Sequence, residues 1–95
     1  MRHTQGFKVL RYRLVRLRAG ITLGELSHTT GISTQYISSI ELLERQPHPE
    51  VQEKMARGLE KALEGRKQDA DRMLRVYYAQ RERLFEQVME TEEEQ

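Results

Sequence analysis

The chain has 95 residues, of which 37% are hydrophobic and 33% are charged, and it contains neither cysteine nor tryptophan. This length suits one compact domain with at most one appended element, and it is too short for an enzyme cleft of ordinary depth. Without cysteine there is no disulfide and no thiolate metal site, which favours a reducing compartment. The first residues lack the apolar run of a secretion signal, and no stretch of about 18 apolar residues occurs. The sequence therefore predicts a cytoplasmic protein that does not enter a membrane.

Basic and acidic residues are separated along the chain, although the formal net charge is only +1. Residues 1–20 contain six basic side chains and no acid, whereas residues 82–94 contain six glutamates and one arginine. Helical proteins often carry solvated charge runs, but a basic front end also favours contact with a polyanion such as nucleic acid. The candidates for phosphate contacts in this front end are Arg2, Lys8, Arg11, Arg13 and Arg18.

Helix-forming residues dominate the composition and only two prolines occur, which predicts an all-α fold. Apolar residues at helical spacing predict a first helix over residues 6–19, ended by Gly20. The sequence Thr22-Leu23-Gly24-Glu25 then matches a capping box, in which a hydroxyl and a carboxylate each accept a backbone N–H. A short second helix is expected over residues 23–29.

A third helix is predicted over residues 34–43, after a turn at Gly31 and an N-cap at Ser33. Ile37 and Ile40 form its inward stripe, with Tyr36 partly packed. Its outer face is uncharged, whereas ordinary solvated helices carry lysine, glutamate and arginine there. Short hydroxyls and an amide suit hydrogen bonds to base edges, and they occur here at Thr34, Gln35, Ser38 and Ser39.

A polar loop over residues 44–48 precedes a fourth helix, which is expected to begin at Pro49 and to end near Gly65. Residues 66–90 contain no proline or glycine and predict one long C-terminal helix. Its apolar residues at intervals of three and four suit a partner helix, so the expected dimer seam is Ala70, Leu74, Tyr77, Leu84 and Val88. Two alternatives remain: this helix folds back onto its own domain, or it binds a different protein.

Residues 12–59 resemble the phage-repressor/Cro type of helix-turn-helix domain, also called the XRE family. The resemblance rests on short segments in a fixed register, including the Pro that follows six residues after Glu41. These segments are Val15-Arg16, Gly20-Ile21-Thr22, Glu25-Leu26-Ser27, Gly31-Ile32-Ser33, Ile37-Ser38, Ile40-Glu41, Pro47, Met55-Ala56 and Leu59. The resemblance implies a compact bundle of about four helices in residues 1–65 that binds DNA. The long C-terminal helix expected within residues 66–95 lies outside the resemblance and rests on residue spacing alone.

The resemblance also implies residue roles. The third helix would lie in the major groove, and its predicted base-reading set is Thr34, Gln35, Tyr36, Ser38 and Ser39. Within this set Thr34, Gln35 and Ser39 face the bases, while Tyr36 and Ser38 lie near the groove wall or backbone. Arg16 and Glu41 match a pair that ties the first helix to the end of the third and is structural. The helix start at Ser33 and the loop residue Arg45 join the predicted phosphate contacts.

Two positions depart from the family pattern. Leu23 stands where the family often has a glutamine that reaches DNA, so that contact is expected to be missing. Leu43 stands where the family favours a helix-stopping glycine. The second departure predicts a longer third helix or a different turn, which affects the loop contacts of Arg45 and Gln46.

No catalytic or metal-binding pattern is found in the sequence. His3, His28 and His48 are scattered, and no phosphate loop or nucleophile–base arrangement occurs. We therefore expect no enzyme activity, no cofactor and no metal. The predicted function is a transcriptional regulator, a repressor in the simplest case, that binds double-stranded DNA as a homodimer on inverted repeats. The alternative is an antitoxin or another interaction module that binds a protein through its C-terminal helix.

Overall fold

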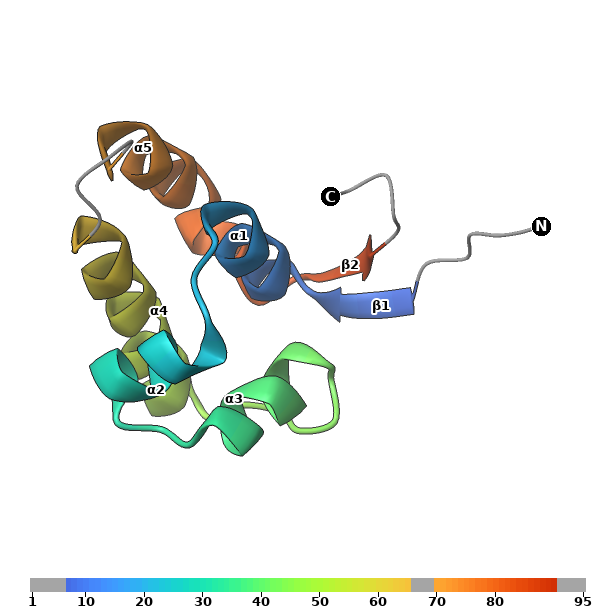
Figure 1. The fold of residues 1–95 in the computed structure, drawn as a ribbon. Helices are drawn as coiled ribbons and strands as arrows, with labels where there is room; N and C mark the ends of the chain where they lie inside the picture. Colours follow the sequence, from blue (N-terminus) through green and yellow to red (C-terminus); the bar gives the residue numbers. More distant parts are fainter. Residues whose placement is uncertain (1–6, 66–69, 91–95) are drawn as a thin grey trace.

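The fold is mostly helical, with one small antiparallel sheet (Figure 1). The structure, a computed structural model, describes residues 7–65 and 70–90. In chain order the elements are β1 (Phe7–Leu10), α1 (Arg11–Ala19), α2 (Leu23–Thr30), α3 (Thr34–Glu41), α4 (Pro49–Glu64), α5 (Ala70–Gln80), the 3-10 helix η1 (Arg81–Arg83) and β2 (Gln87–Glu90). The predicted all-α class is therefore correct for most of the described residues but misses the sheet.

The turn between α1 and α2 forms as the sequence predicts. Gly20 ends α1 in the left-handed conformation, at φ 73°, which glycine adopts without steric cost. The hydroxyl of Thr22 accepts from the backbone N–H of Glu25 at 3.0 Å, and the Glu25 carboxylate accepts from the N–H of Thr22 at 2.9 Å. This capping box is confirmed, and it starts α2 immediately after the turn.

Capping residues also mark the end of α2 and the starts of α3 and α4. Gly31 ends α2 at φ 78°, and the Ser33 hydroxyl accepts from the N–H of Tyr36 at 3.1 Å to begin α3. Pro49 is the first residue of α4, where a missing N–H leaves no helical hydrogen bond unmade. The predicted starts of α3 and α4 are therefore confirmed.

The third helix is shorter than predicted. It ends at Glu41 and not at residue 43, and the chain turns at Leu43, which has φ 66°. Leu43 thus adopts the left-handed conformation that the family assigns to glycine, at a steric cost of about 1–2 kcal/mol. Its side chain packs partly against the core, which offsets some of that cost.

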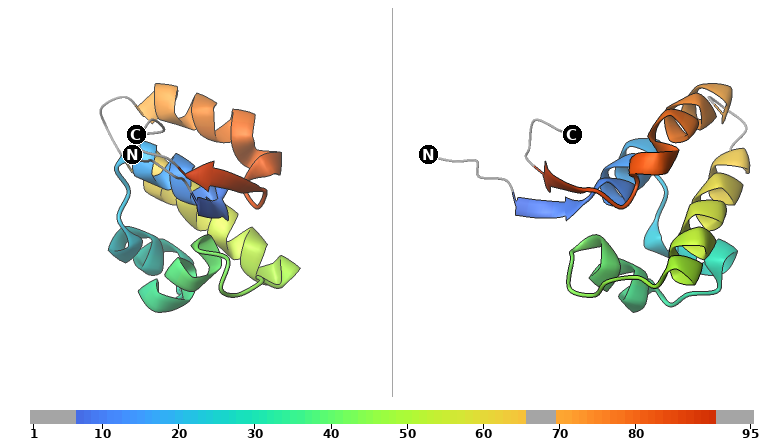
Figure 2. Two further views of the ribbon diagram at one scale, coloured as in Figure 1. Left: turned by 90° about the vertical axis from the view of Figure 1, so that its right-hand side faces the viewer. Right: turned by 180° about the vertical axis from the view of Figure 1, so that it is seen from behind.

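The prediction of one long helix over residues 66–90 is wrong. Within the described residues α5 ends at Gln80, and β2 pairs antiparallel with β1, so that Val9 lies opposite Val88 (Figures 1 and 2). The same pairing replaces helix by strand at residues 7–10, where the first helix was expected to begin. A spacing of three to four residues suits a helix, but hydrogen bonding to a distant strand overrides local helix propensity.

Two buried side chains explain why the C-terminal segment returns to the helices. Tyr77 of α5 and Leu84, just after η1, are fully buried in the same hydrophobic core as α1–α4. The Tyr77 hydroxyl donates to the carbonyl of Ala56 at 2.8 Å. In the same way Tyr12 of α1 donates to the neighbouring carbonyl, that of Met55, at 2.8 Å. Both α1 and α5 are thereby attached to one turn of α4.

Burial perturbs both tyrosines. Desolvation raises the pKa of Tyr77 to about 12 and raises the pKa of Tyr12 further still. Each phenol therefore remains a neutral hydrogen-bond donor at any pH at which the protein is expected to work.

Helices α2 and α4 approach each other closely at Gly58. This residue is buried in α4, and the Thr29 hydroxyl donates to its carbonyl at 2.9 Å. A Cβ atom at Gly58 would overlap the methyl group of Thr30. Because Gly58 has no side chain, α4 and α2 can approach to this distance, and α2 in turn leads directly into α3.

Candidate nucleic-acid interface

The N-terminal half of α3 stands out from the domain with uncharged polar side chains. Ser33, Thr34 and Gln35 are exposed, whereas Ile37 and Ile40 on the opposite side are fully buried. The buried isoleucines and the Ser33 cap hold the helix in place. Gln35 therefore presents a free-standing amide, a group that can donate to and accept from a single base edge.

The other predicted base-reading residues lie closer to the protein. Tyr36, Ser38 and Ser39 are half-buried. The carbonyl of Ser39 accepts from the N–H groups of Glu44 at 2.8 Å and Arg45 at 3.3 Å, so the chain after α3 folds back against it. Thr34 and Gln35 are thus the most accessible members of the predicted set.

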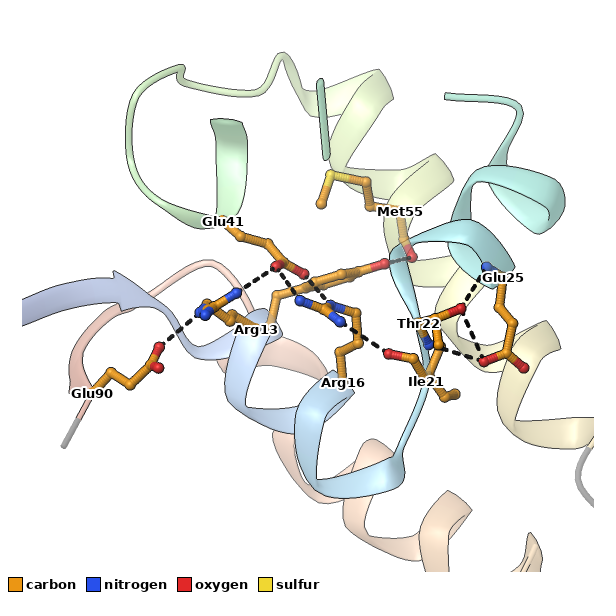
Figure 3. Close-up of polar contacts among 9 residues, drawn as sticks. Arg13, Arg16, Ile21, Thr22, Glu25, Glu41, Met55 and Glu90 are labelled. Carbon is orange, nitrogen blue, oxygen red and sulfur yellow. Dashed lines mark hydrogen bonds and ion pairs between the residues drawn. The ribbon is translucent and has the colours of Figure 1, made fainter. Parts of the chain in front are cut away.

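A buried ion pair fixes the end of α3, as the resemblance implies (Figure 3). The Arg16 guanidinium donates twice to the Glu41 carboxylate, at 2.8 Å each, and once to the carbonyl of Ile21 at 3.0 Å. Glu41 is fully buried and Arg16 nearly so. A paired and hydrogen-bonded buried charge of this kind sets geometry more than it adds stability, so it orients α3 on α1.

Arg13 extends this cluster to the C-terminal strand. Its Nε atom lies 2.7 Å from the carboxylate of Glu90 in β2, and its Nη1 atom lies 3.6 Å from Glu41 (Figure 3). Arg11 is also paired, at 3.4 Å, with Glu86. A hydrogen bond from Arg83, together with the charge of Arg11, holds the pKa of Glu86 below its usual range.

These contacts give Arg11 and Arg13 a role within the chain that the sequence did not predict, while their contact with DNA phosphates stays a prediction. Their assignment to DNA phosphates rests on a basic front end without acidic residues. In the folded chain two carboxylates of the C-terminal segment, Glu86 and Glu90, lie beside them. Both arginines therefore attach that segment to α1.

The remaining predicted phosphate contacts lie on the surface. Arg18, near the end of α1, and Arg45, in the loop after α3, are both exposed. Lys8 of β1 is exposed as well, whereas Arg2 lies outside the described residues. Arg45 holds its guanidinium over the Tyr36 ring, 5.3 Å from the ring centre.

The predicted dimer seam is not one accessible stripe. Tyr77 and Leu84 are fully buried within their own chain, so neither side chain can contact a partner helix. Leu74 and Val88 are half-buried, and Val88 lies on β2 rather than on a helix. Ala70 begins α5, and its side chain is outside the described part.

Sequence reasoning missed two residues that shape this site, Glu90 and Gly58, whereas it singled out Leu43 as standing where the family has glycine. Gly58 carries a weak signal, since a glycine inside a long helical pattern often marks a close approach. Nothing local distinguishes Glu90 from the other C-terminal glutamates.

Further chemistry is not found in residues 7–65 and 70–90. No group of three or more histidine, cysteine, aspartate or glutamate side chains there could hold a metal ion. None of the described helices is long and apolar enough to cross a membrane.

A capped turn between two short helices, with the second one exposing polar side chains, defines a helix-turn-helix domain of the DNA-binding class. The helix-turn-helix family model matches residues 13–65, which is more than half of the chain. The chain belongs to this family, in its XRE type. The family is one of DNA-binding domains and not of enzymes. No curated protein and no solved structure was found to match the chain.

Proposed function

We propose that this protein is a sequence-specific regulator of transcription that inserts α3 into the major groove of double-stranded DNA. The observation that carries the proposal is the exposed, uncharged start of α3, where Thr34 and Gln35 stand out from a helix held by buried neighbours. A solvent-facing helix surface without charge has little value for solubility, but it suits base edges that present donors, acceptors and methyl groups.

Each exposed residue has a role in this proposal. The Gln35 amide pairs with N6 and N7 of an adenine, and the Thr34 methyl contacts a thymine methyl. Ser33 brings the N–H groups at the start of α3 to a phosphate, and Arg18 and Arg45 neutralise further phosphates. Ser38, Ser39 and Tyr36 lie further from the bases and shape the groove wall.

Selection of binding sites from a randomised duplex library tests the proposal. Once a site is found, Gln35→Ala is expected to weaken binding to it by about 1–3 kcal/mol and to relax the preference at one base pair. Gln87→Ala removes an exposed amide from β2 instead of α3 and serves as the control, with little effect expected. If Gln35→Ala binds the selected site as tightly as the wild type, α3 is not the reading helix.

We also propose that two copies bind together on an inverted repeat. One short polar helix makes few contacts, and coupling two such modules raises affinity by their effective concentration. Half-sites about 34 Å apart would place both reading helices on one side of the DNA. The predicted seam does not supply this contact, because Tyr77 and Leu84 are buried in the chain itself. The mass of the protein alone and on DNA measures the number of copies, and a monomer on a single half-site would contradict dimeric binding.

The alternative function, binding of a protein partner through a free C-terminal helix, is favoured by no observation. In the described residues α5 and β2 are attached to the domain by Tyr77, by Leu84 and by pairing with β1. A partner would have to displace these contacts before it could use that helix.

A further inference from the structure

The loop after α3 turns back along the helix that it leaves. Leu43 reverses the chain with φ 66°, and the N–H groups of Glu44 and Arg45 then both donate to the carbonyl of Ser39. The Leu43 backbone angle and the two hydrogen bonds together fix the position of the Arg45 backbone beside α3. Arg45 is separated from Tyr36 by more than two turns of helix in the sequence, but the loop brings the two side chains together.

Arg45 and Tyr36 form a stacked pair at the edge of α3. The guanidinium carbon lies 5.3 Å from the centre of the Tyr36 ring, which is the distance range of a cation–π contact. The ring is half-buried and packs against the hydrophobic core, so it is itself held in place. Arg45 remains exposed. A long, flexible side chain is thus supported on a rigid surface with its charged end in solvent.

This arrangement suits a phosphate contact. An arginine presents five N–H donors in a planar fork that matches phosphate oxygens, and it can stack on an aromatic ring while it donates in its own plane. Because the ring already holds the guanidinium in place, the arginine side chain loses less conformational entropy when it binds a phosphate. The described residues place no carboxylate within ion-pair distance of Arg45, in contrast to Arg11 and Arg13.

We infer that Tyr36 is a positioning residue, which holds Arg45 toward a phosphate of the DNA strand beside the groove that α3 enters. The inference rests on the proposed function and changes the expectation for Tyr36, which acts through Arg45 and not on a base. Its effect on binding is then independent of DNA sequence, and its hydroxyl is dispensable.

Four variants test this on the selected duplex and on a duplex of unrelated sequence, over a range of salt concentrations. Arg45→Ala is expected to weaken both complexes by about tenfold and to reduce the slope of log affinity against log salt by about one. Tyr36→Leu should weaken both by about two- to fivefold, and Tyr36→Phe, which keeps the ring face, should match the wild type. The double variant Tyr36→Leu/Arg45→Ala should bind no more weakly than Arg45→Ala alone.

A matched control removes an exposed arginine elsewhere. Arg83 lies in η1 and bonds the Glu86 carboxylate rather than a group of α3, and Arg83→Ala is expected to leave the salt slope unchanged. Circular dichroism and the urea midpoint of each variant exclude loss of folding as the cause of weaker binding.

Nuclear magnetic resonance of the free protein reports on the stack without DNA. Nuclei of the Arg45 side chain that lie over the ring are shielded, and this shielding should persist in Tyr36→Phe and disappear in Tyr36→Leu. Additive losses in the double variant would overturn the positioning role. A Tyr36→Phe loss confined to the selected duplex would overturn it too, since the hydroxyl would then read a base. A wild type that binds neither duplex would instead refute the proposed function, while the resonance experiment would still report the contact.

Discussion

Substitution of Gly58 by alanine separates two opposing effects of a single methyl group. In an ordinary helix interior the change stabilises by about 1 kcal/mol, because glycine has the greater conformational freedom in the unfolded chain. Gly58 is buried where α4 meets α2, and the added Cβ would overlap the Thr30 methyl. It would also lie 3.0 Å from the Thr29 hydroxyl. In this variant, steric overlap destabilises the folded protein, whereas the higher helix propensity of alanine stabilises it.

The overlap is expected to dominate. Overfilling a closely packed contact costs about 1–3 kcal/mol, and here the neighbours cannot rotate away freely. Both threonine hydroxyls are engaged: Thr29 donates to the Gly58 carbonyl at 2.9 Å, and Thr30 donates to the carbonyl of Leu26 at 2.6 Å. Because the added Cβ would overlap the Thr30 methyl outright, the cost belongs in the upper part of that range, at about 2–3 kcal/mol. After the propensity gain of about 1 kcal/mol is subtracted, we expect Gly58→Ala to lower the free energy of unfolding by about 1–2 kcal/mol. The strain should also move α2, and with it the attachment of α3.

Urea unfolding followed by circular dichroism measures the effect, and two further variants provide its controls. Gly24→Ala places a methyl group in α2 with only the Thr22 hydroxyl nearby, at 3.7 Å, so it should be neutral or stabilising. Thr30→Ser removes the overlapping methyl and keeps both hydrogen bonds of its hydroxyl. The double variant Gly58→Ala/Thr30→Ser should recover part of the loss, with a coupling energy of at least about 1 kcal/mol.

Two results would refute this reasoning. One is a Gly58→Ala variant as stable as the wild type, which would mean that α2 and α4 are not held in contact at this point. The other is strict additivity in the double-mutant cycle, which would assign the loss to something other than the Thr30 methyl.

Two further predictions concern the turn after α3 and the buried tyrosine of α5. In urea unfolding, Leu43→Gly should be more stable than Leu43→Ala by about 1 kcal/mol. Both variants lose the packing of the leucine side chain, but only glycine relieves the left-handed strain. The reverse order of stability would show that the strain is absent. Tyr77 has its pKa raised to about 12, so the unfolded chain loses this proton first and stability should fall as the pH rises from about 10 to about 12. Tyr77→Phe should show a shallower fall across that window, and equal slopes in the two proteins would contradict the raised pKa.

Local signals account for what sequence reasoning predicted well. The capping box of Thr22 and Glu25, the glycine ends of α1 and α2 and the Ser33 cap each involve residues within a few positions of one another. Such hydrogen bonds form wherever the chain is helical, so their residue types can be read without knowledge of the fold. The pairing of Arg16 with Glu41 is not local, and it was predictable only through the family resemblance.

The C-terminal segment shows where local signals fail. The spacing of Tyr77, Leu84 and Val88 satisfies a helix, yet Leu84 fills the core and Val88 lies in a strand. Likewise, the charge of Arg13 predicts a phosphate contact, but nothing in its own segment indicates that Glu90 lies beside it. Residues of opposite charge near the two ends of the described chain can lie in contact, and the spacing of residues along the sequence does not indicate it.

The sequence by itself determined the helix-turn-helix unit, the uncharged exposed start of its third helix and its family, because caps and inward stripes depend on neighbours along the chain. Only the tertiary structure decided the fate of residues 70–90, the partners of Arg11 and Arg13, and the close approach at Gly58. These features depend on which distant segments meet. Strand pairing between β1 and β2 brings the two ends of the described chain together, although the local residue pattern of both predicted helix.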